Sequence, residues 1–195
     1  MSSDRLAVVL RQIDDANARD PEHTETPGSR HPAALAYGLR MSATLDGFAP
    51  DASDHLRIAA RGQHIERWMV PRSSYPEGRT GYLKWRKDLQ AQHADRLSAI
   101  MKSAGYGEAD ASRVAALVRK ERLKVDPEVQ ALEDVACLVF LEHYAGELFA
   151  RYDDQKVIDI LQKTARKMSA GGLAAAGKIK VGERLARLLS LALAG

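Results

Sequence analysis

The sequence is poor in cysteine and contains no pair of closely spaced cysteines of the kind that binds structural zinc. Its single cysteine, Cys137, lies inside an apolar run. An internal disulfide is therefore excluded, and a reducing, cytoplasmic compartment is the expected location. No basic residue adjoins Cys137 in the sequence to lower the pKa of its thiol, so we expect a buried and inert side chain rather than a nucleophile.

Long hydrophobic runs are also absent. No apolar stretch approaches the ~20 residues that a membrane-spanning helix needs. Asp4 and Arg5 interrupt the N-terminus too early for a signal peptide, so no membrane partner is expected. The net charge of +3 is too small to indicate nucleic-acid binding by itself. The positive charge is instead local, because the segment 61–88 holds seven basic and three acidic residues.

Alternating runs of β-branched residues bounded by hairpin turns are nearly absent, whereas helical periodicity recurs along the chain. The length of 195 residues suits one domain, so we predict a single all-α domain, residues 1–195, of seven to nine helices. The segments 20–30 and 70–80 are predicted as loops. Residues 135–141 are continuously apolar, which predicts a helix buried on most sides. The expected helices span residues 4–18, 31–46, 52–68, 81–103, 109–123, 127–151, 153–168 and 183–193.

Basic and aromatic residues are interleaved around the loop 70–80. Both tryptophans of the chain and two of its six tyrosines fall within residues 68–85. Guanidinium groups match phosphate and carboxylate oxygens, and aromatic rings stack on nucleobases. Two other interpretations stay open: a stiff connector whose aromatics belong to the core, and a protein interface. The candidate ligand-binding residues are Arg67, Trp68, Arg72, Tyr75, Arg79, Tyr82, Lys84, Trp85 and Arg86.

The six histidines contain no pair with the i, i+4 spacing of a helical zinc motif. A metal centre would therefore have to be assembled from different helices. His64 and Arg67 lie near the end of an expected helix, after small residues at positions 59, 60 and 62 that allow close helix packing. A solvated helix face anchored by Trp68 is the alternative interpretation of this stretch.

Characteristic strings are distributed over nearly the whole chain. They are Ile13-Asp14-Asp15-Ala16-Asn17, Asp20-Pro21, His31-Pro32, Leu35-Ala36-Tyr37, Gln63-His64-Ile65-Glu66-Arg67-Trp68, Pro71-Arg72, Tyr82-Leu83-Lys84-Trp85-Arg86, Asp159-Ile160-Leu161, Lys163-Thr164 and Lys167-Met168-Ser169. Together they resemble one family, the domain of unknown function numbered 4202.

A more distant resemblance rests on the order of three residues. His31 begins an expected helix, His64 ends the next, and Asp134 precedes the apolar run. This order is similar to that of HD-domain metal-dependent phosphohydrolases. The resemblance implies an HD-like helical domain and a divalent metal ion (Mn, Fe, Zn or similar) held by these residues, with His93 as an additional ligand. The chain departs from the HD pattern beside His64, where Ile65 stands in place of an aspartate or Gln63-His64 in place of His-Asp.

The HD resemblance implies a metal-dependent phosphohydrolase acting on a small phosphorylated metabolite or nucleotide. The metal would lower the pKa of a bound water, and the basic residues of 67–86 would neutralise phosphate oxygens. Lys120 and Glu121 lie where some HD proteins carry another histidine, and they are candidates for proton transfer. The alternative, favoured by the missing carboxylate, is a non-catalytic HD-like module. Such a module would bind a nucleotide, an RNA end or a protein partner through the segment 67–86.

Overall fold

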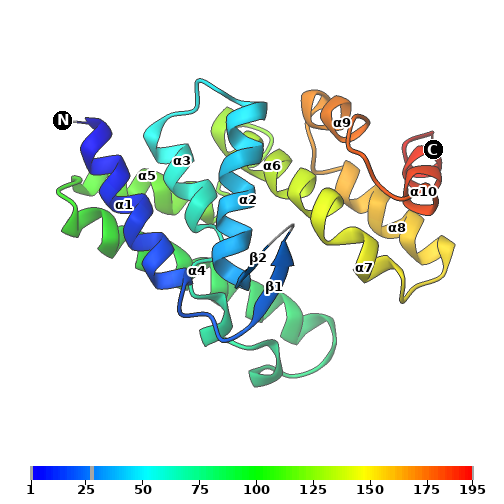
Figure 1. Ribbon diagram of the computed structural model, residues 1–195, viewed down its shortest axis with the longest axis horizontal. Coiled ribbons are helices and arrows are strands. Elements are labelled where there is room, and N and C mark those ends of the chain that lie inside the picture. Colours follow the sequence, from blue (N-terminus) through cyan, green and yellow to red (C-terminus); the bar gives the residue numbers. More distant parts are fainter. Residues whose placement is uncertain (1, 27–28, 195) are drawn as a thin grey trace.

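The computed structural model describes residues 2–26 and 29–194 and confirms the all-α prediction (Figure 1). No helix in this part of the chain is both long and apolar enough to cross a membrane. The elements are α1 (Ser2–Asn17), β1 (His23–Thr26), β2 (Ser29–Pro32), α2 (Ala33–Phe48), α3 (Asp54–Gly62), the 3₁₀ turns η1 (Arg67–Met69) and η2 (Arg72–Ser74), α4 (Gly78–Ser103), α5 (Glu108–Val118), α6 (Pro127–His143), α7 (Ala145–Phe149), α8 (Asp154–Ala165), α9 (Ala170–Ala176) and α10 (Glu183–Ala194).

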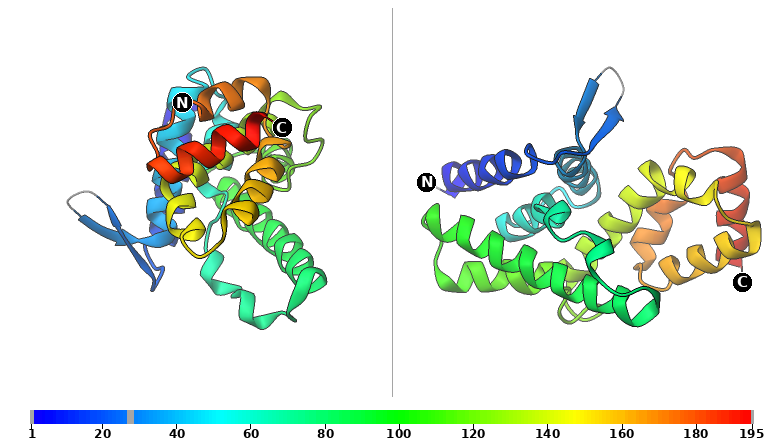
Figure 2. Two further views of the ribbon diagram at one scale, coloured as in Figure 1. Left: turned by 90° about the vertical axis from the view of Figure 1, so that its right-hand side faces the viewer. Right: turned by 90° about the horizontal axis from the view of Figure 1, so that it is seen from below.

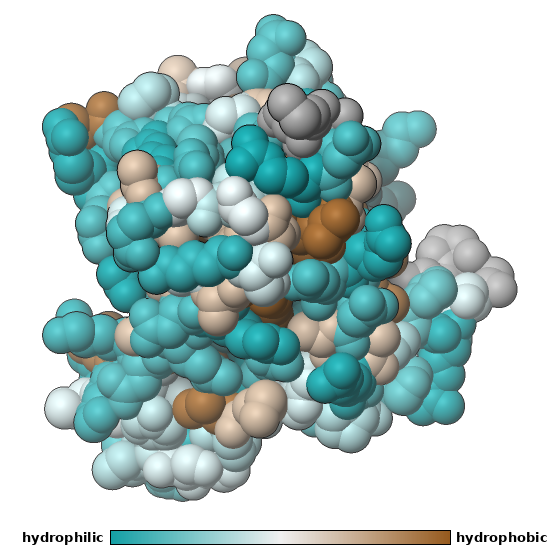
Figure 3. All heavy atoms as spheres, turned by 90° about the vertical axis from the view of Figure 1, so that its left-hand side faces the viewer, coloured by the Kyte–Doolittle hydropathy of each residue, from teal (hydrophilic) through white to brown (hydrophobic). Residues whose placement is uncertain are grey.

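Helix α6 separates two hydrophobic clusters. Its residues Val129, Val135 and Val139 pack into the cluster formed with α1 to α5, whereas Leu138 and Leu141 pack against α7 to α10. Figure 1 accordingly shows α7 to α10 grouped on the far side of α6 from α1. Because α6 has a hydrophobic neighbour on two sides, its stretch 135–141 is continuously apolar and largely buried, as predicted. The face shown in Figure 3 carries only small, separate hydrophobic spots on a largely hydrophilic surface.

The segment predicted as the loop 20–30 contains an antiparallel hairpin instead. Strands β1 and β2 pair with Thr24 opposite His31, and Figure 2 shows the hairpin projecting from the helices. Its described side chains are mostly exposed, so the sequence has no alternation of apolar and polar residues to reveal it. Pro27 and Gly28 lie outside the described residues. The helix expected from His31 begins at Ala33, where the Asp20 carboxylate accepts a hydrogen bond from Ala34 N at 2.9 Å.

The helix predicted to reach residue 68 ends at Gly62. A Cβ on Gly62 would lie 2.4 Å from Leu97, so the absence of a side chain allows α3 and α4 to touch. Four residues later Glu66 adopts a left-handed conformation with φ of 51°, which cannot continue a helix. The Glu66 backbone N–H donates to Asn17 Oδ1 at 3.1 Å. The end of α1 therefore fixes the turn that carries His64.

Three further helix boundaries differ from the prediction. Helix α5 ends at Val118, because Lys120 and two later residues adopt positive φ. The helix expected over 127–151 is broken at Tyr144 into α6 and α7. Helix α9 lies between the expected helices 153–168 and 183–193, where no helix was predicted, and its N-terminus is capped by Ser169, whose Oγ accepts from Gly172 N at 3.0 Å.

Candidate functional site

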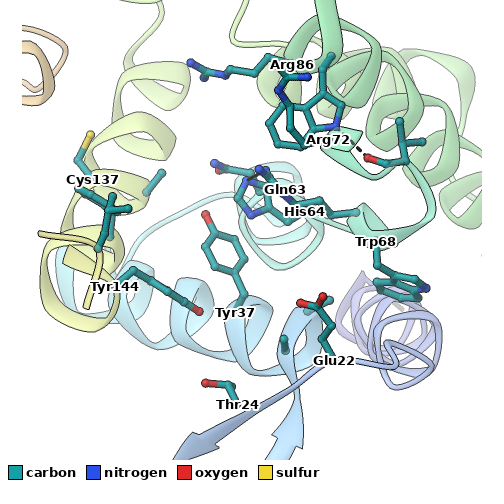
Figure 4. Close-up of a pocket in the computed structure, with 18 of the residues that line it drawn as sticks. Glu22, Thr24, Tyr37, Gln63, His64, Trp68, Arg72, Arg86, Cys137 and Tyr144 are labelled. Carbon is teal, nitrogen blue, oxygen red and sulfur yellow. Dashed lines mark hydrogen bonds between the residues drawn. The ribbon is translucent and has the colours of Figure 1, made fainter. Parts of the chain in front are cut away.

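A pocket of about 800 Å³ opens between α2, the segment 63–72, the start of α4, α6 and α8. It therefore lies where the two hydrophobic clusters meet. Figure 4 shows side chains from these separate elements turned toward its centre, with Trp68 on the side opposite Cys137. Six of the nine predicted ligand-binding residues line this pocket, and we call them the inner set: Arg67, Trp68, Arg72, Tyr82, Trp85 and Arg86.

Aromatic rings and backbone groups hold the inner set in place. The Arg67 guanidinium lies over the Trp85 ring at 4.7 Å, and the Arg86 guanidinium lies 5.9 Å from the Tyr82 ring centroid. Trp85 is fixed in turn, because its Nε1 donates to Val70 O at 2.8 Å. The Arg72 guanidinium donates to Tyr75 O at 2.9 Å, which ties the following loop to the pocket wall.

The guanidinium groups of the inner set have no carboxylate partner among the residues that the structure describes. Within residues 2–26 and 29–194, neither Arg67, Arg72 nor Arg86 forms an ion pair, although other arginines of the chain do. Burial lowers the pKa of Arg67, because its charge is partly removed from water. Buried arginines are usually paired. The inner set therefore presents guanidinium charge to the pocket without a direct ion pair to any carboxylate of the described residues.

His64 lies at the floor of the pocket as a neutral ring. It stacks on Tyr37 with centroids 4.1 Å apart and planes 17° apart. Arg67 Nη1 lies 3.2 Å from His64 Nε2, and since a guanidinium can only donate, Nε2 accepts. Burial and the nearby Arg67 charge lower the pKa of His64 well below its usual value. The lone pair of Nε2 thus points to a guanidinium rather than to a space for a metal ion.

The predicted metal ligands are not assembled into a centre. His31 lies in β2 of the projecting hairpin, and His93 lies beneath His64 with ring centroids 6.1 Å apart. Asp134 instead accepts hydrogen bonds from Ser169 N at 2.8 Å and from Ser169 Oγ, which docks the start of α9 against α6. Throughout residues 2–26 and 29–194, no group of three His, Cys, Asp or Glu side chains is placed to hold an ion. The residues present therefore do not fit the metal centre that the HD resemblance implies.

Glu133, next to Asp134 in the sequence, lines the pocket, and the sequence did not indicate it as a site residue. Its side chain is 6% exposed and forms an ion pair with Lys120, while Lys167 Nζ lies 4.0 Å from Oε1. Burial opposes ionisation of Glu133, but the charges of Lys120 and Lys167 outweigh it and lower the pKa. Glu121, the other candidate for proton transfer, is exposed and lies 4.0 Å from Arg119. The structure thus pairs Lys120 with Glu133 and leaves Glu121 outside the pocket.

The other three predicted ligand-binding residues, Tyr75, Arg79 and Lys84, do not line the pocket, and we call them the outer set. Tyr75 Oη donates to Asp88 at 2.9 Å, and Lys84 Nζ donates to the same carboxylate at 2.6 Å. Arg79 is exposed near the start of α4. Lys84 and Tyr75 lower the pKa of Asp88 by these hydrogen bonds. The outer set is thus a solvent-facing cluster rather than part of the cavity.

Several pocket residues had only indirect signals in the sequence. Tyr37, Gln63 and Lys167 belong to the characteristic strings, but nothing in those strings assigns them to a pocket. Tyr144 comes from the break between α6 and α7, which the sequence did not predict. Cys137 also lines the pocket; it is buried, as predicted, and burial raises the pKa of its thiol to about 12.

Comparisons with known proteins give one match. No curated protein and no solved structure matches the chain. Residues 7–189 match the family Domain of unknown function (DUF4202). This stretch contains every element that lines the pocket, from the loop before β1 to the end of α8. The chain therefore belongs to the DUF4202 family.

Proposed function

We propose that the pocket binds a small phosphorylated metabolite or a nucleotide. The observation that carries this proposal is the inner set, whose arginines Arg67, Arg72 and Arg86 lack carboxylate partners within residues 2–26 and 29–194. A phosphate group would supply the missing negative charge. One planar guanidinium group can donate two parallel hydrogen bonds to two phosphate oxygens, and these bonds are stronger than those between neutral groups.

The size and walls of the pocket support the same class of ligand. Its volume of about 800 Å³ suits a metabolite or nucleotide rather than a bare ion. Trp68 and Tyr82 add aromatic surface on which a planar ring could stack. The neutral His64 adds no positive charge of its own, and its hydrogen bond from Arg67 holds that guanidinium in the pocket. The ligand would therefore be held by charge at the inner set and by apolar contact at the walls.

Hydrolysis by a metal-dependent mechanism stays a prediction. It came from the HD resemblance, and the residues assigned to the metal have other partners or lie apart. Incubating the protein with nucleoside phosphates and Mn²⁺, beside a sample treated with chelator, would measure phosphate release. Release that depends on added metal and is lost in His64→Ala would support the hydrolase, and no release would leave binding as the activity.

Binding itself is tested by thermal unfolding and calorimetric titration with pyrophosphate and with adenosine 5′-monophosphate. A ligand present at about 100 times its dissociation constant should stabilise the folded state by about 2–3 kcal/mol. Acetate at the same ionic strength serves as the control for nonspecific screening. A protein whose unfolding temperature responds to neither phosphate compound would contradict the proposal.

A further inference from the structure

Glu133 is an ionised carboxylate inside a pocket that otherwise presents positive charge. Its Oε2 accepts a hydrogen bond from Lys120 Nζ. Its Oε1 lies 4.0 Å from Lys167 Nζ, beyond hydrogen-bond distance, and no other residue within 2–26 and 29–194 donates to it. The side chain is 6% exposed and lines the pocket, so the cavity is where Oε1 can meet a donor. Oε1 therefore keeps an acceptor position that a ligand or water in the pocket can fill, besides its long-range ion pair with Lys167.

The donor that would complete Oε1 is a neutral one. Lys120, Lys167 and Arg86 all lie close enough to Glu133 to influence its charge electrostatically. Together with Arg67 they would repel an ammonium group of a ligand. A hydroxyl group donates a hydrogen bond without adding positive charge, and hydrogen bonds to ionised acceptors are roughly twice as strong as neutral ones.

We propose that Glu133 Oε1 accepts a hydrogen bond from a sugar hydroxyl of the ligand, so that the pocket selects phosphorylated sugars, whether free or as part of a nucleotide. This inference rests on the proposed function, because the inner set must hold the phosphate. The arginines would then give affinity for any phosphate. Glu133 would distinguish ligands that carry a hydroxyl group from ligands that lack one. Carboxylates bind ribose hydroxyls in this way in dinucleotide-binding folds.

Calorimetric titration of the unmodified protein tests the inference with four probes: pyrophosphate, ribose 5-phosphate, adenosine 5′-monophosphate and 2′,3′-dideoxyadenosine 5′-monophosphate. The dideoxy compound keeps the phosphate and the base and lacks the hydroxyls. We expect it to bind about 10- to 100-fold more weakly than adenosine 5′-monophosphate, the range for one hydrogen bond to a charged group. Ribose 5-phosphate as strong as the nucleotide would identify a free sugar phosphate as the ligand, and weaker binding would identify a nucleotide.

The variant Glu133→Gln keeps the shape of the side chain and removes its charge. It should bind the hydroxylated and dideoxy nucleotides within about threefold of one another, and it should bind pyrophosphate as tightly as before or more tightly. Asp134→Asn is the matched control, since it makes the same charge change one residue along but faces Ser169. It should keep the discrimination. A melting curve for each variant establishes that it is folded, and the titrations of the unmodified protein need no variant.

Two results would overturn the inference while leaving the proposed function standing. One is equal binding of the hydroxylated and dideoxy nucleotides to the unmodified protein, and the other is binding of pyrophosphate alone. If none of the four probes binds, the proposed function itself fails. Discrimination that survives in Glu133→Gln would show that another residue contacts the hydroxyls, and would also overturn the assignment to Glu133.

Discussion

The inner and outer sets come from the same twenty residues, and both combine basic with aromatic side chains, but their surroundings differ. Arg67 and Arg86 face the pocket without an ion pair within the described residues, whereas Lys84 and Tyr75 share the Asp88 carboxylate in water. Positive charge that already has a partner in solvent contributes little to binding, because water and salt screen it. Under the proposed function, the ligand would therefore bind where the positive charge lacks an ion pair, and not simply where basic residues are dense along the sequence.

As the pH falls, protonation of His93, which lies under the pocket residue His64, should destabilise the folded protein before Asp88, which binds the outer set, becomes protonated. Burial lowers the pKa of His93, which lies under His64, to about 4. The unfolded chain takes up this proton near the ordinary value of about 6.5, so stability is complete above that pH and is lost as the pH falls toward 4. The loss for this residue is about 3 kcal/mol, at about 1.4 kcal/mol per pKa unit. Asp88, whose pKa is lowered, stays charged over the same range.

Urea unfolding near pH 7 and near pH 4 measures this loss. The variant His93→Gln has no proton to gain and should show a flatter dependence of unfolding free energy on pH. If the variant and the unmodified protein lose stability equally between these two pH values, His93 is not the group responsible.

Arg67→Gln should cause the largest single loss of ligand affinity, about 100-fold for pyrophosphate. The guanidinium is partly buried, so removing it takes away a strong hydrogen bond to phosphate and a desolvated charge, worth about 3 kcal/mol. Calorimetric titration measures the change. Nuclear magnetic resonance of the same variant should show the pKa of His64 moving upward, since Arg67 is one of the causes that lower it. An unchanged affinity would remove Arg67 from the site.

Gly81→Ala should disturb the chain around Pro76, which leads into α4. An added Cβ would lie 1.9 Å from the Pro76 carbonyl oxygen, so the loop must move, at an expected cost of about 1–3 kcal/mol in unfolding free energy. Gly47→Ala is the control, because nothing lies within 4 Å of a Cβ there. Chemical unfolding of both variants measures the difference. Equal stabilities would mean that the approach of Pro76 to α4 is not close.

Lys84→Gln should have the smallest effect. Its ion pair with Asp88 spans one helical turn at the surface, and such pairs contribute less than about 1 kcal/mol to stability. We expect less than a twofold change in the affinity for pyrophosphate at moderate salt. A loss as large as that of Arg67→Gln would erase the distinction between the inner and outer sets.

The helical fold was predictable because its signals are local. Apolar periodicity, proline and glycine located the ends of α1, α4 and α10 to within three residues, and the buried nature of α6 followed from the continuous apolarity of residues 135–141. The hairpin β1–β2 was not predictable, since its side chains are mostly exposed and carry no alternation. The early end of α3 was not predictable either, because it depends on the contact of Gly62 with Leu97 and on the hydrogen bond that Glu66 N donates to Asn17.

The site was predictable only in part, because a pocket is made by distant segments. Clustered bases and aromatics gave nine candidates, six of which line the pocket, but the sequence could not separate these six from the three whose side chains point elsewhere. Glu133 and Asp134 show the same limit most sharply. The two neighbouring carboxylates differ by one position on α6, so one faces the pocket and the other Ser169. Successive residues of a helix point about 100° apart, and the sequence alone does not reveal which direction faces the pocket.

The most direct test compares two double variants with the same loss of charge, Arg67→Gln with Arg86→Gln and Arg79→Gln with Lys84→Gln. Each removes two positive charges from the segment 67–86, so any difference reports where the charges point rather than how many there are. Calorimetric titration with pyrophosphate should show binding abolished or weakened at least about 100-fold in the inner pair and changed less than about threefold in the outer pair. Equal losses in the two variants would contradict the claim that the unpaired guanidinium groups of the pocket form the binding site.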